Sequence, residues 1–206
     1  MEALRLSLMV LFHPADSFRR IKSDRSRFDS KPIFVILFLL IVVRVAYIYL
    51  CHFPLALIQP RDTNIFLEIV KLILPVVSWA VSCYAVTTIM DGGSLMRETM
   101  TASVYCMMPY IYFTIPLAVI SHVLGLSELM LYRALTAGIW IWVVLLFLIS
   151  IKVMNEYTVL QTIGVSLITL VTLILIWAAF LLLATLTGQL IDFVRSLIIE
   201  LRFFLR

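Results

Sequence analysis

The sequence predicts an all-α, polytopic membrane bundle of about five transmembrane helices with an amphipathic helix at each end. Of its 206 residues, 63% are hydrophobic and only 14% are charged, whereas a soluble domain averages roughly 45–50% and about 25%. The chain also contains five apolar runs, each long enough to provide the about 20 residues that cross a ~30 Å hydrocarbon core. This composition excludes a soluble enzyme domain and a disordered chain.

The segment before the first run, residues 1–32, is predicted to be cytoplasmic or interfacial. Within it, Pro14 stands at the first position of a short helix and Asp16 lies in the first turn. Phe18 and Ile21 are expected to face lipid. The basic residues of this helix are expected to reach head-group phosphates: Arg19, Arg20 and Lys22. The alternative is that they only determine topology and bind nothing specific.

The five apolar runs are predicted to be membrane-spanning helices. They are continuous rather than alternating, and a backbone in lipid must satisfy its own hydrogen bonds, so they are helices and not barrel strands. Together they form a single membrane domain over residues 1–206, with an amphipathic tail at 189–206. The runs cover about 33–53, 66–90, 102–124, 133–151 and 162–188.

The distribution of Lys and Arg predicts a cytoplasmic N-terminus. Seven basic residues precede the first run, and such residues favour the cytoplasmic side. Five crossings then place the C-terminus outside. Three arginines in the tail favour a cytoplasmic C-terminus instead, namely Arg195, Arg202 and Arg206. The seven basic residues before the first run outnumber them.

Arg44 is the one basic residue near the middle of the first run. A central Arg costs roughly 2.5–3.5 kcal/mol on insertion, so its guanidinium should face the bundle interior. Tyr47 follows at helical spacing and extends a buried polar seam. Two interpretations remain open, namely a strut between helices and an anchor for a substrate or partner.

Two prolines in the third run are predicted to supply the hydrogen-bond acceptors for Arg44. Pro109 and Pro116 each remove a backbone bond and release a carbonyl one turn earlier, at Tyr105 and Tyr112. No acid is expected at matching depth, because the acidic residues of the second run stand at its opposite ends, at Glu68 and Asp91.

The loop after the second run is the most distinctive polar segment. Gly92 and Gly93 are expected to take positive φ values and to end the helix, and Ser94 is expected to cap the next one. Together with Asp91 and Arg97, the glycines form a candidate partner-binding surface. The alternative is an ordinary connection between two helices.

Motifs of enzymes and metal sites are absent from the sequence. There is no GxSxG, HExxH or P-loop, and the three cysteines and three histidines are scattered. We therefore expect no catalytic residue, no metal, no cofactor and no nucleic-acid partner.

Two stretches resemble the Yip1-domain family. Leu11–Lys22 is similar to its F-x-P-x-x-x-F-x-x-I entry segment. Asp91-Gly92-Gly93 with Glu98, followed by Pro109-Tyr110-Ile111, is similar to its Gly-rich loop and the P-Y-hydrophobic start of the next span. The chain looks like the compact bacterial branch. That resemblance implies a protein that accompanies the permeases of carbohydrate ABC importers, with no catalytic residues to carry over.

The resulting hypothesis is a non-enzymatic accessory or scaffold subunit in a bacterial plasma membrane. Its expected partners are membrane lipids and an integral membrane protein such as an ABC permease subunit. One alternative is a small transporter or channel with its path along the Arg44 seam, and another is an intramembrane enzyme.

Overall fold

The computed structural model describes residues 2–23, 31–51 and 63–204, and it is helical without strands in these ranges. The prediction of an all-α fold is confirmed. In chain order the elements are α1 (Glu2–Phe12), α2 (Pro14–Ser23), α3 (Lys31–Leu50), α4 (Ile65–Ile89), α5 (Met96–Tyr105), α6 (Met108–Ile120), η1 (Leu126–Glu128), α7 (Leu129–Asn155) and α8 (Val159–Phe204).

Five helical segments are long and apolar enough to cross a membrane. Four of them are α3, α4, α7 and the first 38 residues of α8, and the fifth is α5 together with α6. The prediction of about five membrane helices is therefore confirmed.

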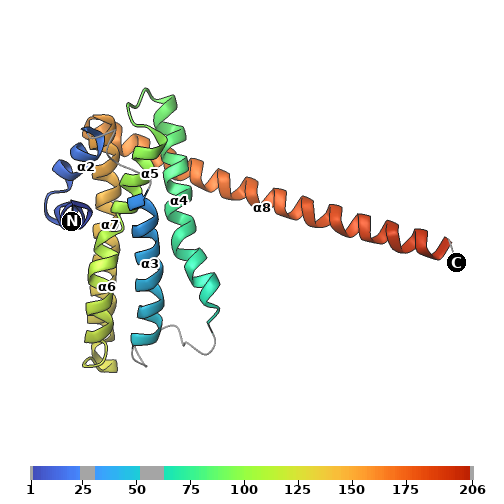
Figure 1. The fold of residues 1–206 in the computed structure, drawn as a ribbon, viewed down its shortest axis with the longest axis horizontal. Coiled ribbons are helices and arrows are strands. Elements are labelled where there is room, and N and C mark those ends of the chain that lie inside the picture. Colours follow the sequence, from blue (N-terminus) through green and yellow to red (C-terminus); the bar gives the residue numbers. More distant parts are fainter. Residues whose placement is uncertain (1, 24–30, 52–62, 205–206) are drawn as a thin grey trace.

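The bundle is built from α3, α4, α6 and α7, with α5 continuing α6 toward one end (Figure 1). The spans α3, α4, α5 with α6, and α7 alternate in direction (Figure 1). Within the bundle α3 packs against α6 and α5, α4 against α5, and α6 against α7. Their contact is a core of interdigitating side chains that includes Leu40, Val43, Val76, Tyr105 and Leu146. α1 and α2 cover one end of this bundle.

The third predicted run differs from the structure in two ways. It begins at Met96, because the polar residues of α5 point inward: Glu98, Thr99, Thr101 and Ser103 are buried. It is also interrupted between Tyr105 and Met108. Pro109 lies in the first turn of α6. N–H groups in the first turn have no partner within the helix, so the lack of one at Pro109 costs no hydrogen bond.

The expectation that Phe18 and Ile21 face lipid is wrong. Their side chains are 0% and 1% exposed, as part of the main hydrophobic core. The ends of α5 and α7 cover the apolar side of α2, so the bundle itself removes these residues from water. α2 is consequently an integral part of the fold.

α8 is a single helix of 46 residues, about 69 Å long at 1.5 Å per residue. It continues through the boundary between the predicted fifth run and tail. Its first part packs against α4 as far as Trp177, whose Nε1 lies 3.3 Å from Ser78 Oγ. Beyond that point it leaves the bundle across the direction of the other helices (Figure 1).

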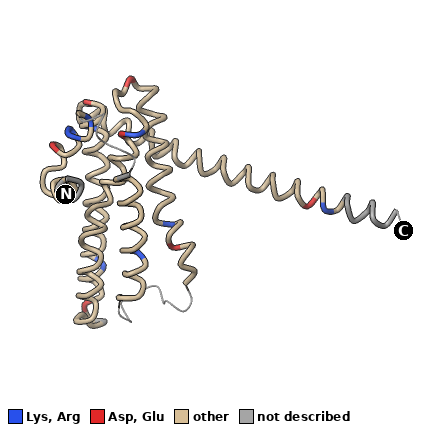
Figure 2. The backbone as a smooth tube through the Cα atoms, viewed as in Figure 1, with Lys and Arg blue, Asp and Glu red and all other residues tan. Residues whose placement is uncertain are grey.

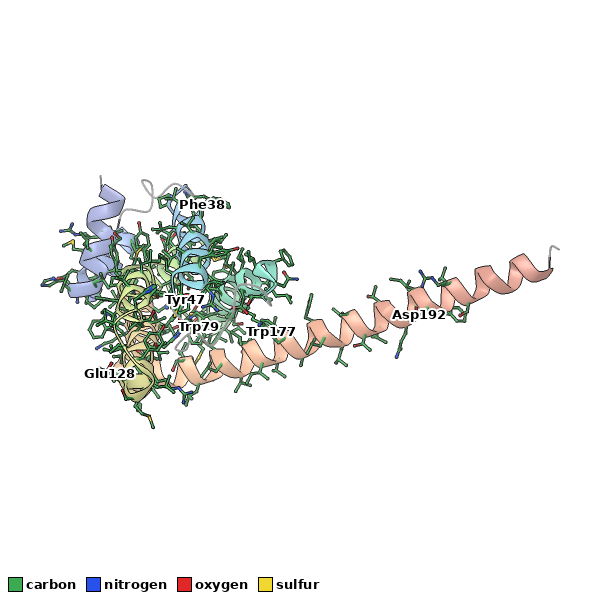
Figure 3. All side chains as sticks on the ribbon, turned by 90° about the horizontal axis from the view of Figure 1, so that it is seen from below. Phe38, Tyr47, Trp79, Glu128, Trp177 and Asp192 are labelled. Carbon is green, nitrogen blue, oxygen red and sulfur yellow. The ribbon has the colours of Figure 1, made fainter. Side chains whose placement is uncertain are left out.

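Beyond Trp177, the stretch Ala178–Ile191 of α8 contains no charged residue and is mostly apolar. Figure 3 shows Trp177 beside the bundle and Asp192 far from it. From Ala178 to Ser196 all side chains are exposed, and a helix that is apolar all round is stable in lipid or against another protein. Half of the polar stripe predicted for the tail consists of Glu200, Arg202 and Arg206, whose side chains lie outside those that the structure describes.

Candidate functional site

A charged cluster lies between α3 and α4, and we call Arg44, Glu68 and Lys71 the charged triad. Arg44 stands six residues before the end of α3, and Lys71 stands six residues after the start of α4. Each is therefore about 9 Å along its helix from the same end of the bundle. Figure 2 shows charged residues partway along the bundle helices, below those gathered at the upper end of the bundle.

One carboxylate serves both cations of the triad. Arg44 Nη2 donates to Glu68 Oε2, and Lys71 Nζ donates to Glu68 Oε1 at 2.9 Å. The Glu68 side chain is 8% exposed and that of Arg44 18%, whereas that of Lys71 is 70% exposed. The Arg44–Glu68 pair is thus enclosed, and Lys71 forms its outer edge.

Two predictions about Arg44 are wrong: that carbonyls released by proline accept its hydrogen bonds, and that no acidic residue lies at its depth. The guanidinium binds the Glu68 carboxylate, and its Nη1 lies 3.4 Å from the Tyr110 hydroxyl. The predicted first run, about 33–53, begins and ends two to three residues later than α3 does. Arg44 therefore lies in the last two turns of α3 and not near its middle. That position is level with the first turn of α4, where Glu68 stands.

The polar seam extends from Arg44 to α7. The guanidinium carbon lies 5.7 Å from the centroid of the Tyr47 ring, within cation–π range. The Tyr47 hydroxyl lies 2.8 Å from that of Tyr132, which in turn lies 3.3 Å from Cys51 Sγ. Of the two prolines expected in this seam, Pro109 is buried and Pro116 is exposed. The seam therefore links α3, α4, α6 and α7 through side chains.

A second polar region, the basic face, lies at the end of the bundle covered by α2. It consists of Arg19, Arg20, Lys22 and Arg97. The first two are exposed on α2, and Arg97 is exposed in the first turn of α5. Figure 2 shows charged residues of both signs gathered at this end. Arg19 and Lys22 also line a shallow hollow of about 620 Å³ with Ser23, Val153 and Glu156.

α2 and the loop after α4 lie next to each other at the basic face. A Cβ added to Gly93 would lie 3.9 Å from Lys22 Nζ, and α2 packs against α5 and α7. The structure thus places all the predicted partner-binding residues at one end of the bundle. These are Arg19, Arg20, Lys22, Asp91, Gly92, Gly93 and Arg97.

An ion pair fastens α2 to the end of α7. Lys22 Nζ lies 2.7 Å from Glu156 Oε1, and Glu156 occupies the left-handed position that ends α7, with φ 57°. The Lys22 hydrogen bond and charge hold the pKa of Glu156 below its ordinary value near 4.5.

The loop glycines do not take the conformation expected of them. Asp91, with φ 54°, is the residue in the left-handed region, and neither glycine has a positive φ. Asp is one of the few residues that tolerate this conformation, so no glycine is needed there. Gly92 is required for space instead, because an added Cβ would lie 2.6 Å from Asn155 Oδ1 and 2.8 Å from the Thr87 carbonyl oxygen.

Ser94 does not cap α5 as expected. Its hydroxyl donates to Asn155 Oδ1 at 2.8 Å, and the N-cap residue is Leu95, whose N–H donates to Glu98 Oε2 at 2.9 Å. Tyr157 adds a further link, from its hydroxyl to the Met90 carbonyl at 3.0 Å. The loop is therefore fastened to the end of α7 by side chains.

Sequence reasoning missed Glu68, Asn155, Glu156 and Tyr157 as parts of these regions. For Glu68 a signal existed, since Lys71 follows it at the i,i+3 spacing that brings side chains together on a helix. For the other three, the contacts join residues more than sixty positions apart, and no local pattern reports such pairs.

Comparisons with known proteins identify the family of this bundle. A model of the Yip1 domain matches residues 8–181, which includes both polar regions and ends partway along α8. Comparisons with curated proteins and with solved structures find no match. The chain thus belongs to the Yip1-domain family and is a multi-pass membrane protein.

Proposed function

We propose that this protein is a non-enzymatic accessory or scaffold subunit that docks an integral membrane partner on its basic face. In the proposed orientation the N-terminus and the basic face are cytoplasmic, in a bacterial plasma membrane. The proposed partner is a permease subunit of a carbohydrate ABC importer, as the resemblance to the compact bacterial branch implies.

The observation that carries this proposal is the rigid presentation of positive charge by α2. Phe18 and Ile21 anchor the helix in the core, and Lys22 is bonded to Glu156. Arg19 and Arg20 consequently project from a fixed surface beside a hollow. Exposed arginines at fixed positions favour association with a complementary acidic surface near the membrane plane, beside the Lys22–Glu156 pair.

The charged triad favours a scaffold over the alternative of a transporter with its path at Arg44. The charges of a path usually face a water-filled cavity. Here the enclosed Arg44 is bonded to Glu68 and Tyr110, so the cluster can act as a strut between α3, α4 and α6.

Charge reversal at the basic face tests the proposal. Arg97→Glu and the double variant Arg19→Glu, Arg20→Glu should lose most of the permease subunits that co-purify in mild detergent, as identified by mass spectrometry. Arg133→Glu is the matched control, because Arg133 is exposed in α7 at the opposite end of the bundle and should retain them.

Two results would overturn the proposal. One is a complex that survives charge reversal but dissolves on Gly188→Leu in the exposed half of α8, which would place the contact within the bilayer. The other is transport activity of the purified protein alone that is abolished by Arg44→Met in a stably folded variant, which would favour the transporter.

A further inference from the structure

We propose that the charged triad binds the phosphate of an acidic phospholipid in the leaflet on the side opposite the basic face. The inference is independent of the proposed docking function. It rests on the charge balance of the triad, on its depth in the bundle and on the surface around Lys71.

The triad has an unbalanced positive charge. Arg44 and Lys71 contribute two positive charges and Glu68 contributes one negative charge, which leaves a formal net charge of +1. Among the residues that the structure describes, the other polar groups in contact with Arg44 are the hydroxyl of Tyr110 and the ring of Tyr47, and both are neutral. An excess cation within a membrane helix is costly unless an anion approaches it.

The excess charge is located on the outside of the bundle. Glu68 and Arg44 enclose each other, so the accessible cation is Lys71, whose side chain is 70% exposed. Lys71 Nζ uses one of its three donor positions for Glu68. The remaining donors are available to an acceptor that approaches from the lipid side.

The depth of Lys71 suits a lipid head group. The residue lies about 9 Å along α4 from Ile65, and a Lys side chain near a helix end extends its amine toward the interface. A carboxylate from a partner helix would itself have to be buried at this depth. A lipid phosphate is already present at the level that the amine can reach.

The surface around Lys71 suits the rest of a lipid. In the view of Figure 1, α4 tilts away from α3 toward this end of the bundle, and α8 covers α4 only farther along, near Ser78. Among the described residues of α3 and α4 near this end, the exposed apolar side chains that acyl chains would contact include Tyr49, Leu50, Phe66, Leu67 and Leu74.

Thermal unfolding of the full chain in detergent micelles doped with lipid tests the proposal. Phosphatidylglycerol at tenfold excess over its Kd should raise Tm by about 3–6 °C, and zwitterionic phosphatidylcholine should raise it by less. Lys71→Gln should abolish this difference, and Lys71→Arg should keep it. Arg133→Gln is the matched control, because Arg133 is an exposed cation near the same end of the bundle but outside the triad, and it should also keep the difference.

A second measurement needs no variant. In native mass spectrometry, the wild-type protein exchanged into an equimolar mixture of the two lipids should retain phosphatidylglycerol preferentially. Inorganic phosphate alone should leave Tm unchanged, because it lacks the acyl chains; an equal shift with free phosphate would identify a phosphate site without lipid selectivity and overturn the proposal. The proposal is also overturned if the two lipids are retained equally, which is the result expected if Lys71 instead serves a carboxylate of a partner, or if Arg133→Gln removes the preference as fully as Lys71→Gln does.

Discussion

Gly92 occupies a position at which the space beside Asn155 and Thr87 allows no side chain. Gly92→Ala should destabilise the protein by about 1–3 kcal/mol, as overpacking of a tight contact does, because the backbone carbonyl of Thr87 cannot move freely. Gly138→Ala is the matched control, since nothing lies within 4 Å of its added Cβ, and it should be neutral or slightly stabilising. Thermal unfolding of both variants checks the difference, and equal Tm values would show that Asn155 and Thr87 do not constrain Gly92.

Arg44 and Glu68 should be energetically coupled. Arg44→Met leaves a buried carboxylate with Lys71 as its remaining cation, and Glu68→Met leaves a buried guanidinium with weaker partners, so each should destabilise the fold. The double variant should cost less than the sum, with a coupling energy of about 0.5–3 kcal/mol for residues in direct contact. A double-mutant cycle in detergent measures this coupling, and strictly additive effects would show that the pair is not a strut.

Glu68 and Gly92 also show how far the structural role of a single residue can be predicted from the sequence. The cost of an intramembrane charge predicts correctly that Arg44 needs acceptors, but not which ones, because the answer depends on the register of two helices. The glycines of the loop suggest positive φ. The actual constraint on Gly92 is a neighbour more than sixty residues away, which local conformational preference does not contain.

At the scale of elements, the docking of α2 should depend on pH. The folded-state pKa of Glu156 is lowered, so the Lys22–Glu156 pair stabilises α2 above the ordinary pKa of a glutamate. This stabilisation is lost as the pH falls from the ordinary value near 4.5 through the lowered folded-state pKa. Amide hydrogen exchange of α2, corrected for the intrinsic rates, should show reduced protection in that range.

Glu156→Gln is the control for this pH dependence. It should lower the protection of α2 already at neutral pH and remove the part of the pH dependence that comes from the pair. If the wild-type protein and Glu156→Gln respond alike between pH 3 and pH 7, then α2 is held by Phe18 and Ile21 alone.

The membrane helices are the elements that sequence predicts best, since length and apolarity are read directly from composition. The polar residues of α5 are hidden from that criterion because they are buried among other helices. The prediction for α2 failed for a related reason, because its apolar side could have faced either lipid or the bundle. Local amphipathicity cannot choose between two apolar surroundings.

For the whole molecule, we predict that all five candidate spans cross the membrane, which would place the two ends of the chain on opposite sides. A reporter fused after Ser23 should be cytoplasmic, and one fused after Arg206 should be outside. Activity of both reporters in the same compartment would mean that α8, despite its continuous apolar surface, does not cross the bilayer. The result would also fix the leaflet in which the proposed lipid site lies.

The pairing of Arg44 with Glu68 has a consequence for the synthesis and membrane insertion of the protein. The two residues are 24 positions apart, so at about 5–20 residues per second the ribosome makes the carboxylate roughly 1–5 s after the guanidinium. Because α3 precedes α4 in the chain, α3 reaches the membrane first, with its charge not yet matched by Glu68. Its insertion must therefore depend on its own Leu, Ile, Val and Phe residues, each of which contributes about 0.3–0.6 kcal/mol. Polar substitutions in α3 should for this reason impair biogenesis more than equivalent ones in α4.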